Sequence, residues 1–134
     1  MADTVTSQTI QDGERVAILK FTNESDGTGE ASVKKVDVSA LTKDSRGRSC
    51  SSVSISRIYW ACRGMGVDIE FDATANVLAI PLPADSTGDE YYDLFSGIPN
   101  NAGSGVTGDI DFTTVGHTNG DAYSIILVLT KNYS

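Results

Sequence analysis

Apolar side chains recur at every second position along this sequence, and each such run is short. In Met65–Phe71 the odd-numbered residues are all apolar, while a glycine and two acids fill the positions between them. Successive side chains of an extended strand point to opposite faces, so this period predicts a half-buried antiparallel strand. Val16–Thr22 and Val36–Ala40 follow the same period. In Tyr123–Thr130 both phases are largely apolar, which predicts a central strand or one covered by a neighbouring subunit.

Residues typical of turns separate these runs at short intervals, as in Ser25–Gly29, Asp72–Asn76 and Pro99–Gly105. No stretch carries an amphipathic helical pattern of three turns, and the best helical candidate, Asp89–Phe95, is about two turns at most. About eight short strands with little or no helix predict an all-β fold. We expect a single antiparallel β-sandwich with jelly-roll-like topology.

Local details refine this prediction. The apolar phase changes within Val53–Cys62, which predicts a bulge near Ser56–Arg57 and places Trp60 in phase with the core residues. Val77–Leu82 contains a proline and is followed by another, as is typical of an edge strand. The Asn119-Gly120 turn signal favours a hairpin between the last strand and the short strand before it.

The length of 134 residues suits one domain with its own core. We assign residues 13–134 to the sandwich. Residues 1–12 are polar and β-prone, so they are either a first strand or an arm that pairs with another chain.

Charge is unevenly distributed along the chain, whose net charge is −8. Nine of the ten basic residues precede Gly64, whereas residues 64–130 contain ten acids and no Lys or Arg. An acidic surface repels phosphate, so binding to nucleic acid is not expected. No apolar run approaches the roughly 20 residues of a membrane span, and no secretory signal is visible. Cys50 and Cys62 are therefore expected to be reduced thiols, with one disulfide left open as the alternative.

Residues with catalytic or metal-binding potential are sparse. The single histidine, His117, has no G-x-S-x-G partner motif, and one His with two Cys twelve positions apart makes no zinc set. The acids of Asp85–Asp93 lack EF-hand spacing, although a cation in that loop is not excluded by sequence. We expect no enzyme activity, no cofactor and no metal site.

Two groups of residues are candidates for binding a partner. Basic residues concentrate within about twenty positions, and Arg pairs well with carboxylates, so they predict a contact patch for an acidic protein, with a solvated loop as the alternative. Two adjacent tyrosines form a possible exposed aromatic surface that stacks on sugar rings. The basic candidates are Lys43, Arg46, Arg48, Arg57 and Arg63, and the aromatic candidates are Tyr91 and Tyr92.

Three stretches together resemble a family. Met65–Thr74 (MGVDIEFDAT), Gly108–Thr114 (GDIDFTT) and Gly120–Lys131 (GDAYSIILVLTK) resemble small virion structural proteins of tailed bacteriophages, of the marine and cyanophage type, in particular head decoration (cement) proteins. These are strand-and-turn motifs without chemistry. No contact residue can therefore be carried over from the family.

The resemblance implies a β-sandwich, made in the host cytoplasm, that binds the major capsid protein on the outer surface of the icosahedral head and stabilises it, typically as a homotrimer. The alternatives are a carbohydrate- or receptor-binding module of a tail or fibre, and another minor virion or head–tail protein. If the basic loop faces the capsid, the acidic half of the chain is expected to face solvent.

Overall fold

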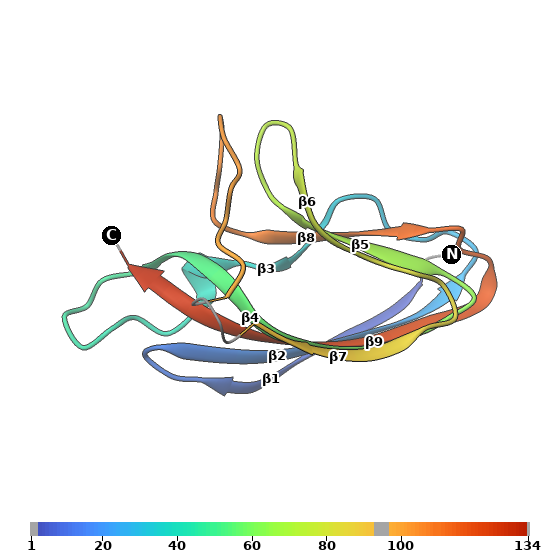
Figure 1. Cartoon of the computed structure of the whole chain (residues 1–134), viewed down its shortest axis with the longest axis horizontal. Helices are drawn as coiled ribbons and strands as arrows, with labels where there is room; N and C mark the ends of the chain where they lie inside the picture. The colour runs from blue at the N-terminus through green and yellow to red at the C-terminus, as the bar shows by residue number, and fades with distance from the viewer. Residues whose placement is uncertain (1–2, 93–96, 134) are drawn as a thin grey trace.

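The computed structural model describes residues 3–92 and 97–133, and the regular secondary structure of this part of the chain is almost entirely β. Its nine strands form two antiparallel sheets, which lie face to face in Figure 1. The five-stranded sheet has the order β1 (Thr4–Asp12), β2 (Val16–Asp26), β9 (Asn119–Tyr133), β4 (Cys50–Arg63) and β7 (Thr87–Tyr91). The four-stranded sheet has the order β3 (Val33–Val36), β8 (Ile110–Val115), β5 (Gly66–Phe71) and β6 (Val77–Leu82). The predicted all-β sandwich is confirmed.

Strands β2 to β9 are nested in the manner of a jelly roll. β2 pairs with β9, β3 with β8, β4 with β7, and β5 with β6, and every pair is antiparallel. A long double-stranded ribbon rolled onto itself produces this nesting, and its successive pairs fall alternately into the two sheets. β1 lies outside the nest and extends the five-stranded sheet next to β2. No helix in the described residues is long and apolar enough to cross a membrane.

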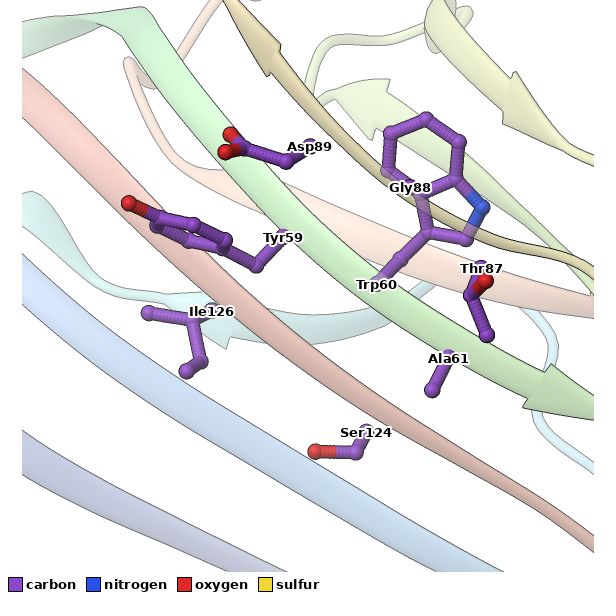
Figure 2. A pocket seen from close by; sticks show the side chains of 8 residues that line it. All are labelled: Tyr59, Trp60, Ala61, Thr87, Gly88, Asp89, Ser124 and Ile126. Carbon is purple, nitrogen blue, oxygen red and sulfur yellow. The ribbon is translucent and has the colours of Figure 1, made fainter.

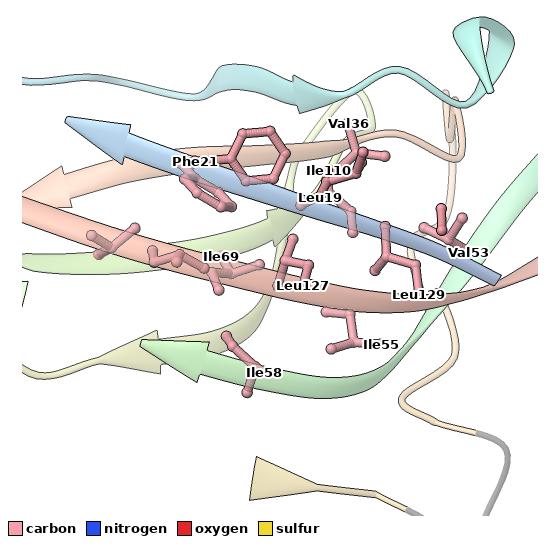
Figure 3. Packing of buried hydrophobic residues seen from close by; sticks show 14 of the residues in the cluster. Leu19, Phe21, Val36, Val53, Ile55, Ile58, Ile69, Ile110, Leu127 and Leu129 are labelled. Carbon is pink, nitrogen blue, oxygen red and sulfur yellow. The ribbon is translucent and has the colours of Figure 1, made fainter. Parts of the chain in front are cut away.

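The core lies between the sheets, where the apolar phases of their strands meet (Figure 3). The ring of Phe112 in the four-stranded sheet makes T-shaped contacts with the rings of Phe21 and Tyr123 in the other sheet, with ring centroids 5.4 and 5.8 Å apart. Such edge contacts add to the free energy of burial and tie the sheets together. The fully buried aliphatic residues around them include Ile55, Ile58, Ile69, Ile110, Leu127 and Leu129.

Three predicted details are confirmed. β9 is the middle strand of its sheet, as its two apolar phases indicate. The pairing of β4 with β9 shifts between Ile55 and Arg57, where the phase change predicts a bulge. β6 is an edge strand, and Pro81 is tolerated there because an edge strand has one side without a hydrogen-bonding neighbour.

Other predicted details are wrong. β8 and β9 do not form a hairpin, because the chain crosses from one sheet to the other between them. Asn119-Gly120 therefore opens β9 after a corner. The run Val36–Ala40 does not continue as a strand. It ends in a 3-10 helix, η1 (Val38–Ala40), whose first turn is capped by the Asp37 carboxylate accepting from the Ser39 N–H at 3.0 Å. Residues 89–91 of the best helical candidate belong to β7, in keeping with the expected scarcity of helix, and residues 93–96 lie outside the described chain.

The two cysteines are both buried in β4 and both are free thiols. Cys50 pairs with Tyr133 of β9 and Cys62 with Tyr123, so ten residues of strand, or about 33 Å, separate the two cysteines, whereas a disulfide needs its Cα atoms within about 7 Å. A disulfide between them is therefore impossible in this fold. Burial raises the pKa of Cys62 to about 11 and also raises that of Cys50, so both thiols stay protonated at neutral pH.

Candidate functional site

The outward surface of the five-stranded sheet is the most distinctive surface of the described chain, and we call it the outer sheet face. The four-stranded sheet covers the opposite side of β2, β4 and β9 (Figure 1). Strand register aligns outward side chains into rows across all five strands. The rows are Tyr91–Arg57–Val128–Ile18–Gln11, Asp89–Tyr59–Ile126–Lys20–Gln8 and Thr87–Ala61–Ser124–Thr22–Thr6.

Apolar side chains occupy the centre of the outer sheet face. Ile18, Ile126, Val128 and Tyr59 are half-buried by their neighbours on the sheet. They sit at the positions of β2, β4 and β9 that alternate with the core residues. In an antiparallel sheet with one solvated face, these positions are usually polar. The apolar second phase of β9 is therefore explained by this face and not by the core.

An arginine at the β4–β7 edge is held between aromatic rings. The Arg57 guanidinium lies 4.7 Å from the ring centroid of Tyr59 and 5.2 Å from that of Tyr91. Its Nε and Nη2 donate to the two carboxylate oxygens of Asp89 at 3.0 and 2.8 Å. These hydrogen bonds lower the pKa of Asp89. An exposed ion pair contributes little to stability, so the consequence of this geometry is a fixed, planar cation at the surface.

Tyr59 and Asp89, which both contact this arginine, also line a shallow hollow of about 480 Å³. Figure 2 shows the side chains that line it. Tyr59 and Ile126 supply apolar surface, while Thr87, Asp89 and Ser124 supply polar atoms. Trp60 borders the hollow where its ring packs over Gly88, and its Nε1 donates to the Ser86 Oγ at 3.0 Å. Trp60 is half-buried and packs against the core, as its phase predicts. The hollow combines an aromatic wall with hydroxyl and carboxylate groups.

The basic candidates do not form one patch. Lys43, Arg46 and Arg48 lie in the loop that precedes β4, and Arg48 pairs with Asp44 at 2.7 Å. Arg57 sits on the outer sheet face near the middle of β4. Arg63 ends that strand, about 20 Å from Arg57, and donates to the Gly120 carbonyl at 3.0 Å. Closeness in sequence does not bring these basic residues together in space, because an extended strand spreads its residues over a long distance.

The two adjacent tyrosines point to opposite faces. Tyr91 is 60% exposed and belongs to the outer sheet face. Tyr92 is half-buried and packs against the core, and burial raises its pKa. Successive side chains on an extended segment alternate in direction, so one of a pair turns inward. The prediction of a shared exposed surface is wrong for Tyr92, and the ring that accompanies Tyr91 is that of Tyr59.

The division of charge along the sequence does not divide the molecule into two sides. β1, β2 and β4 come from the first half of the chain, and β7 and β9, which lie in the same sheet, come from the acidic half. The charge of the outer sheet face nevertheless differs from that of the whole chain. Its three rows contain two cations, Lys20 and Arg57, and one acid, Asp89, in a chain of net charge −8.

A buried carboxyl lies on the other sheet. Asp111 of β8 is 2% exposed, and its Oδ2 accepts from the Asn76 Nδ2 at 2.9 Å. Its Oδ1 accepts no hydrogen bond from the described residues. Burial, and then a hydrogen bond with Asp72, raise the pKa of Asp111 to about 6. A raised pKa means that the Asp111 carboxyl takes up its proton already in weak acid.

The residues considered for catalysis or metal binding are separated in the fold. His117 Nδ1 lies 3.0 Å from the Thr114 Oγ1. Asp85 accepts from the Gly64 N–H at 2.7 Å, while Asp89 pairs with Arg57 and Asp93 lies outside the described residues. Within residues 3–92 and 97–133, no three His, Cys, Asp or Glu side chains are placed to hold a metal ion together.

Comparison with known proteins found no family model that matches the chain and no curated protein with significant similarity.

Proposed function

We propose that this protein is a non-enzymatic decoration protein of a tailed-phage head, which binds the outside of the assembled shell through the outer sheet face. The observation that supports docking is that face itself, because it joins half-buried apolar residues to a fixed arginine. The capsid as partner is supported by the sequence resemblance to cement proteins. Jelly rolls also recur in viral capsid and lectin domains, a likeness of fold that suits this proposal without choosing among partners.

The chemistry of the outer sheet face suits an acidic protein surface. Arg57 gives two of its five N–H groups to Asp89 in the described structure, which leaves three for a partner's carboxylate. The rings of Tyr59 and Tyr91 fix its orientation, so little side-chain entropy is lost on binding. Ile126 and Val128 supply the apolar contact that the centre of an interface needs.

Such a protein stabilises a shell by mass action. A module that binds the assembled shell and not its separate subunits lowers the free energy of the assembled state. Weak individual contacts suffice when many copies bind the same particle. The proposed role therefore requires a rigid docking face and no active site.

Binding to heads of the phage that encodes the chain tests this proposal. Purified protein is added to heads lacking it, and bound protein is measured after sedimentation. We expect saturable binding that Arg57→Glu reduces at least tenfold. We expect Ile126→Lys to lose binding as well, although this substitution removes no positive charge.

Arg46→Glu is the matched control, because it makes the same charge change in the loop before β4, outside the outer sheet face. We expect its binding to equal that of the unmodified chain. If Arg46→Glu abolished binding while Arg57→Glu left it intact, docking through the sheet would be wrong. Absence of any binding to heads would overturn the decoration role itself.

A carbohydrate-binding module is the second candidate, and the hollow beside Arg57 favours it. The Tyr59 ring offers a stacking surface, and Thr87, Asp89 and Ser124 offer hydrogen-bonding groups. A glycan array should then give hits that Tyr59→Ala removes and Tyr92→Ala leaves in place. An array without hits excludes this candidate.

A further inference from the structure

Strand β1 buries almost none of its own side chains, which is unusual for a strand of nine residues. Every residue from Thr4 to Gln11 is exposed, on both faces of the strand. Val5 is 41% and Ile10 is 51% exposed. Hydrophobic burial therefore does not hold β1 in place, and other contacts must fix it.

Polar contacts anchor the N-terminal end of β1. The Asp3 carboxylate accepts from the backbone N–H groups of Asp26 and Gly29, both at 3.2 Å, and from the Asn23 Nδ2 at 3.0 Å. Asn23 is 2% exposed and also donates to the buried Glu30 at 3.0 Å. The strand thus begins on a buried hydrogen-bond network.

The other end of β1 is anchored in the same way. Asp12 forms an ion pair with Lys131, whose side chain is fully buried. Asp12 also accepts from the Thr42 N–H at 2.9 Å. With both ends held and its middle exposed, β1 is a rigid edge and not a loose arm.

The free edge of β1 differs from the other three edges of the sandwich. β6 carries Pro81, β7 is a five-residue strand with two acids, and β3 is a four-residue strand with Lys34 and Lys35. Proline, short length and charge are the usual features that prevent strand pairing at an edge. β1 has no charge between Thr4 and Gln11 and no proline. Its register shift at Thr9/Gln11 leaves Thr4–Thr9 regular.

We propose that β1 is a self-association edge, on which the β1 strand of a second copy of this chain pairs antiparallel. The occupant is a second copy because the edge is self-complementary. Its Thr, Ser and Gln side chains each donate and accept hydrogen bonds, so identical strands can satisfy each other. The uncharged edge also lets two chains of net charge −8 approach without placing like charges opposite each other.

This pairing joins two five-stranded sheets into one of ten strands. A two-fold axis perpendicular to the joined sheet keeps both outer sheet faces on the same side. The dimer thus presents both outer sheet faces in one direction. The pairing itself does not depend on the proposed function, whereas the use of these two faces for docking rests on it. The dimer also differs from the trimer that the sequence resemblance implies, so the native mass separates the two.

Native mass measured by light scattering and sedimentation on the full chain tests the proposal. We expect twice the chain mass of 14.2 kDa at micromolar to millimolar concentration. Ser7→Lys/Gln8→Lys places like charges across the paired edge and is expected to give the mass of one chain. Both sites are exposed, so circular dichroism should stay unchanged, and thermal unfolding should match that of the unmodified chain diluted below the concentration at which it dimerises.

Ser49→Lys is the matched control, since it adds a lysine at an exposed serine in the loop before β4 and should leave the dimer intact. A single-chain mass for the unmodified protein at millimolar concentration, a three-chain mass, or a dimer that survives Ser7→Lys/Gln8→Lys overturns the proposal. Head binding is measured separately. If the variant with the mass of one chain still binds heads, head binding does not require the dimer, and the two proposals are tested separately.

Discussion

Replacing Asp111 by asparagine should change the unfolding free energy by an amount that depends on pH. Relative to the unmodified chain, the variant should be favoured more at neutral pH than in weak acid. Asp111 is buried on β8, and its pKa is raised to about 6 by burial first and by its hydrogen bond with Asp72 second. In the unfolded chain its pKa is about 3.9. Between about pH 4 and pH 6, the folded protein therefore holds a proton on Asp111 that the unfolded chain has already released.

The sign of the effect follows from proton binding. Because the folded state binds the proton more tightly, the contribution of Asp111 to stability is complete below pH 4 and is lost as the pH rises through 6. A difference of about two pKa units corresponds to about 3 kcal/mol. The pKa of Asp72 is lowered, so its own contribution changes below about pH 4, outside this window.

Urea unfolding of both proteins at several pH values between 4 and 7.5 measures the effect. Asparagine does not titrate, so the difference in unfolding free energy between the two proteins isolates the carboxyl. We expect that difference to shift by about 3 kcal/mol in favour of Asp111→Asn as the pH rises.

Asp72→Asn provides the control within the pair. It removes the second cause of the shift and leaves burial, so the pH-dependent loss should shrink without disappearing. If the difference between Asp111→Asn and the unmodified protein did not change with pH, the raised pKa of Asp111 would be refuted.

Three further predictions concern packing and the anchored edge. Asp12→Ala leaves Lys131 buried without its carboxylate and should lower the unfolding free energy by about 3–5 kcal/mol, and a loss below about 1 kcal/mol in urea titration contradicts the burial of that pair. Gly88→Ala places a Cβ 2.4 Å from the Trp60 ring, so it should shift tryptophan emission and cost about 1–3 kcal/mol, whereas Gly103→Ala, with nothing within 4 Å of its Cβ, should change neither. The two buried thiols should resist a thiol reagent in the native state and react in equal amounts after unfolding, and rapid native reaction of either would be inconsistent with their burial.

Hydrophobic periodicity was sufficient to predict the sandwich, because its strands bury one phase. The two apolar phases of β9 predicted a central strand or one covered by a neighbouring subunit, and the structure places the second phase, Ile126 and Val128, on the outer sheet face. The hairpin failed because the Asn119-Gly120 signal reports a local turn and cannot tell whether the flanking strands share a sheet.

The arginine site could not be predicted from sequence. Arg57 and Asp89 are 32 positions apart, and only the pairing of β4 with β7 brings them together. Register is a tertiary property, set by core packing of both strands. The basic residues fail to form one patch for another reason, because the extended β4 separates Arg63 from Arg57 by about 20 Å and Lys43 lies in the loop before that strand.

A cryo-EM reconstruction of the phage particle tests the central proposal most directly. The account predicts copies of this jelly roll arranged symmetrically over the outside of the head, with the outer sheet face, Arg57 included, against the capsid protein. Density for the chain at the neck or tail alone, or a head-bound sandwich with that face turned to solvent, would contradict it.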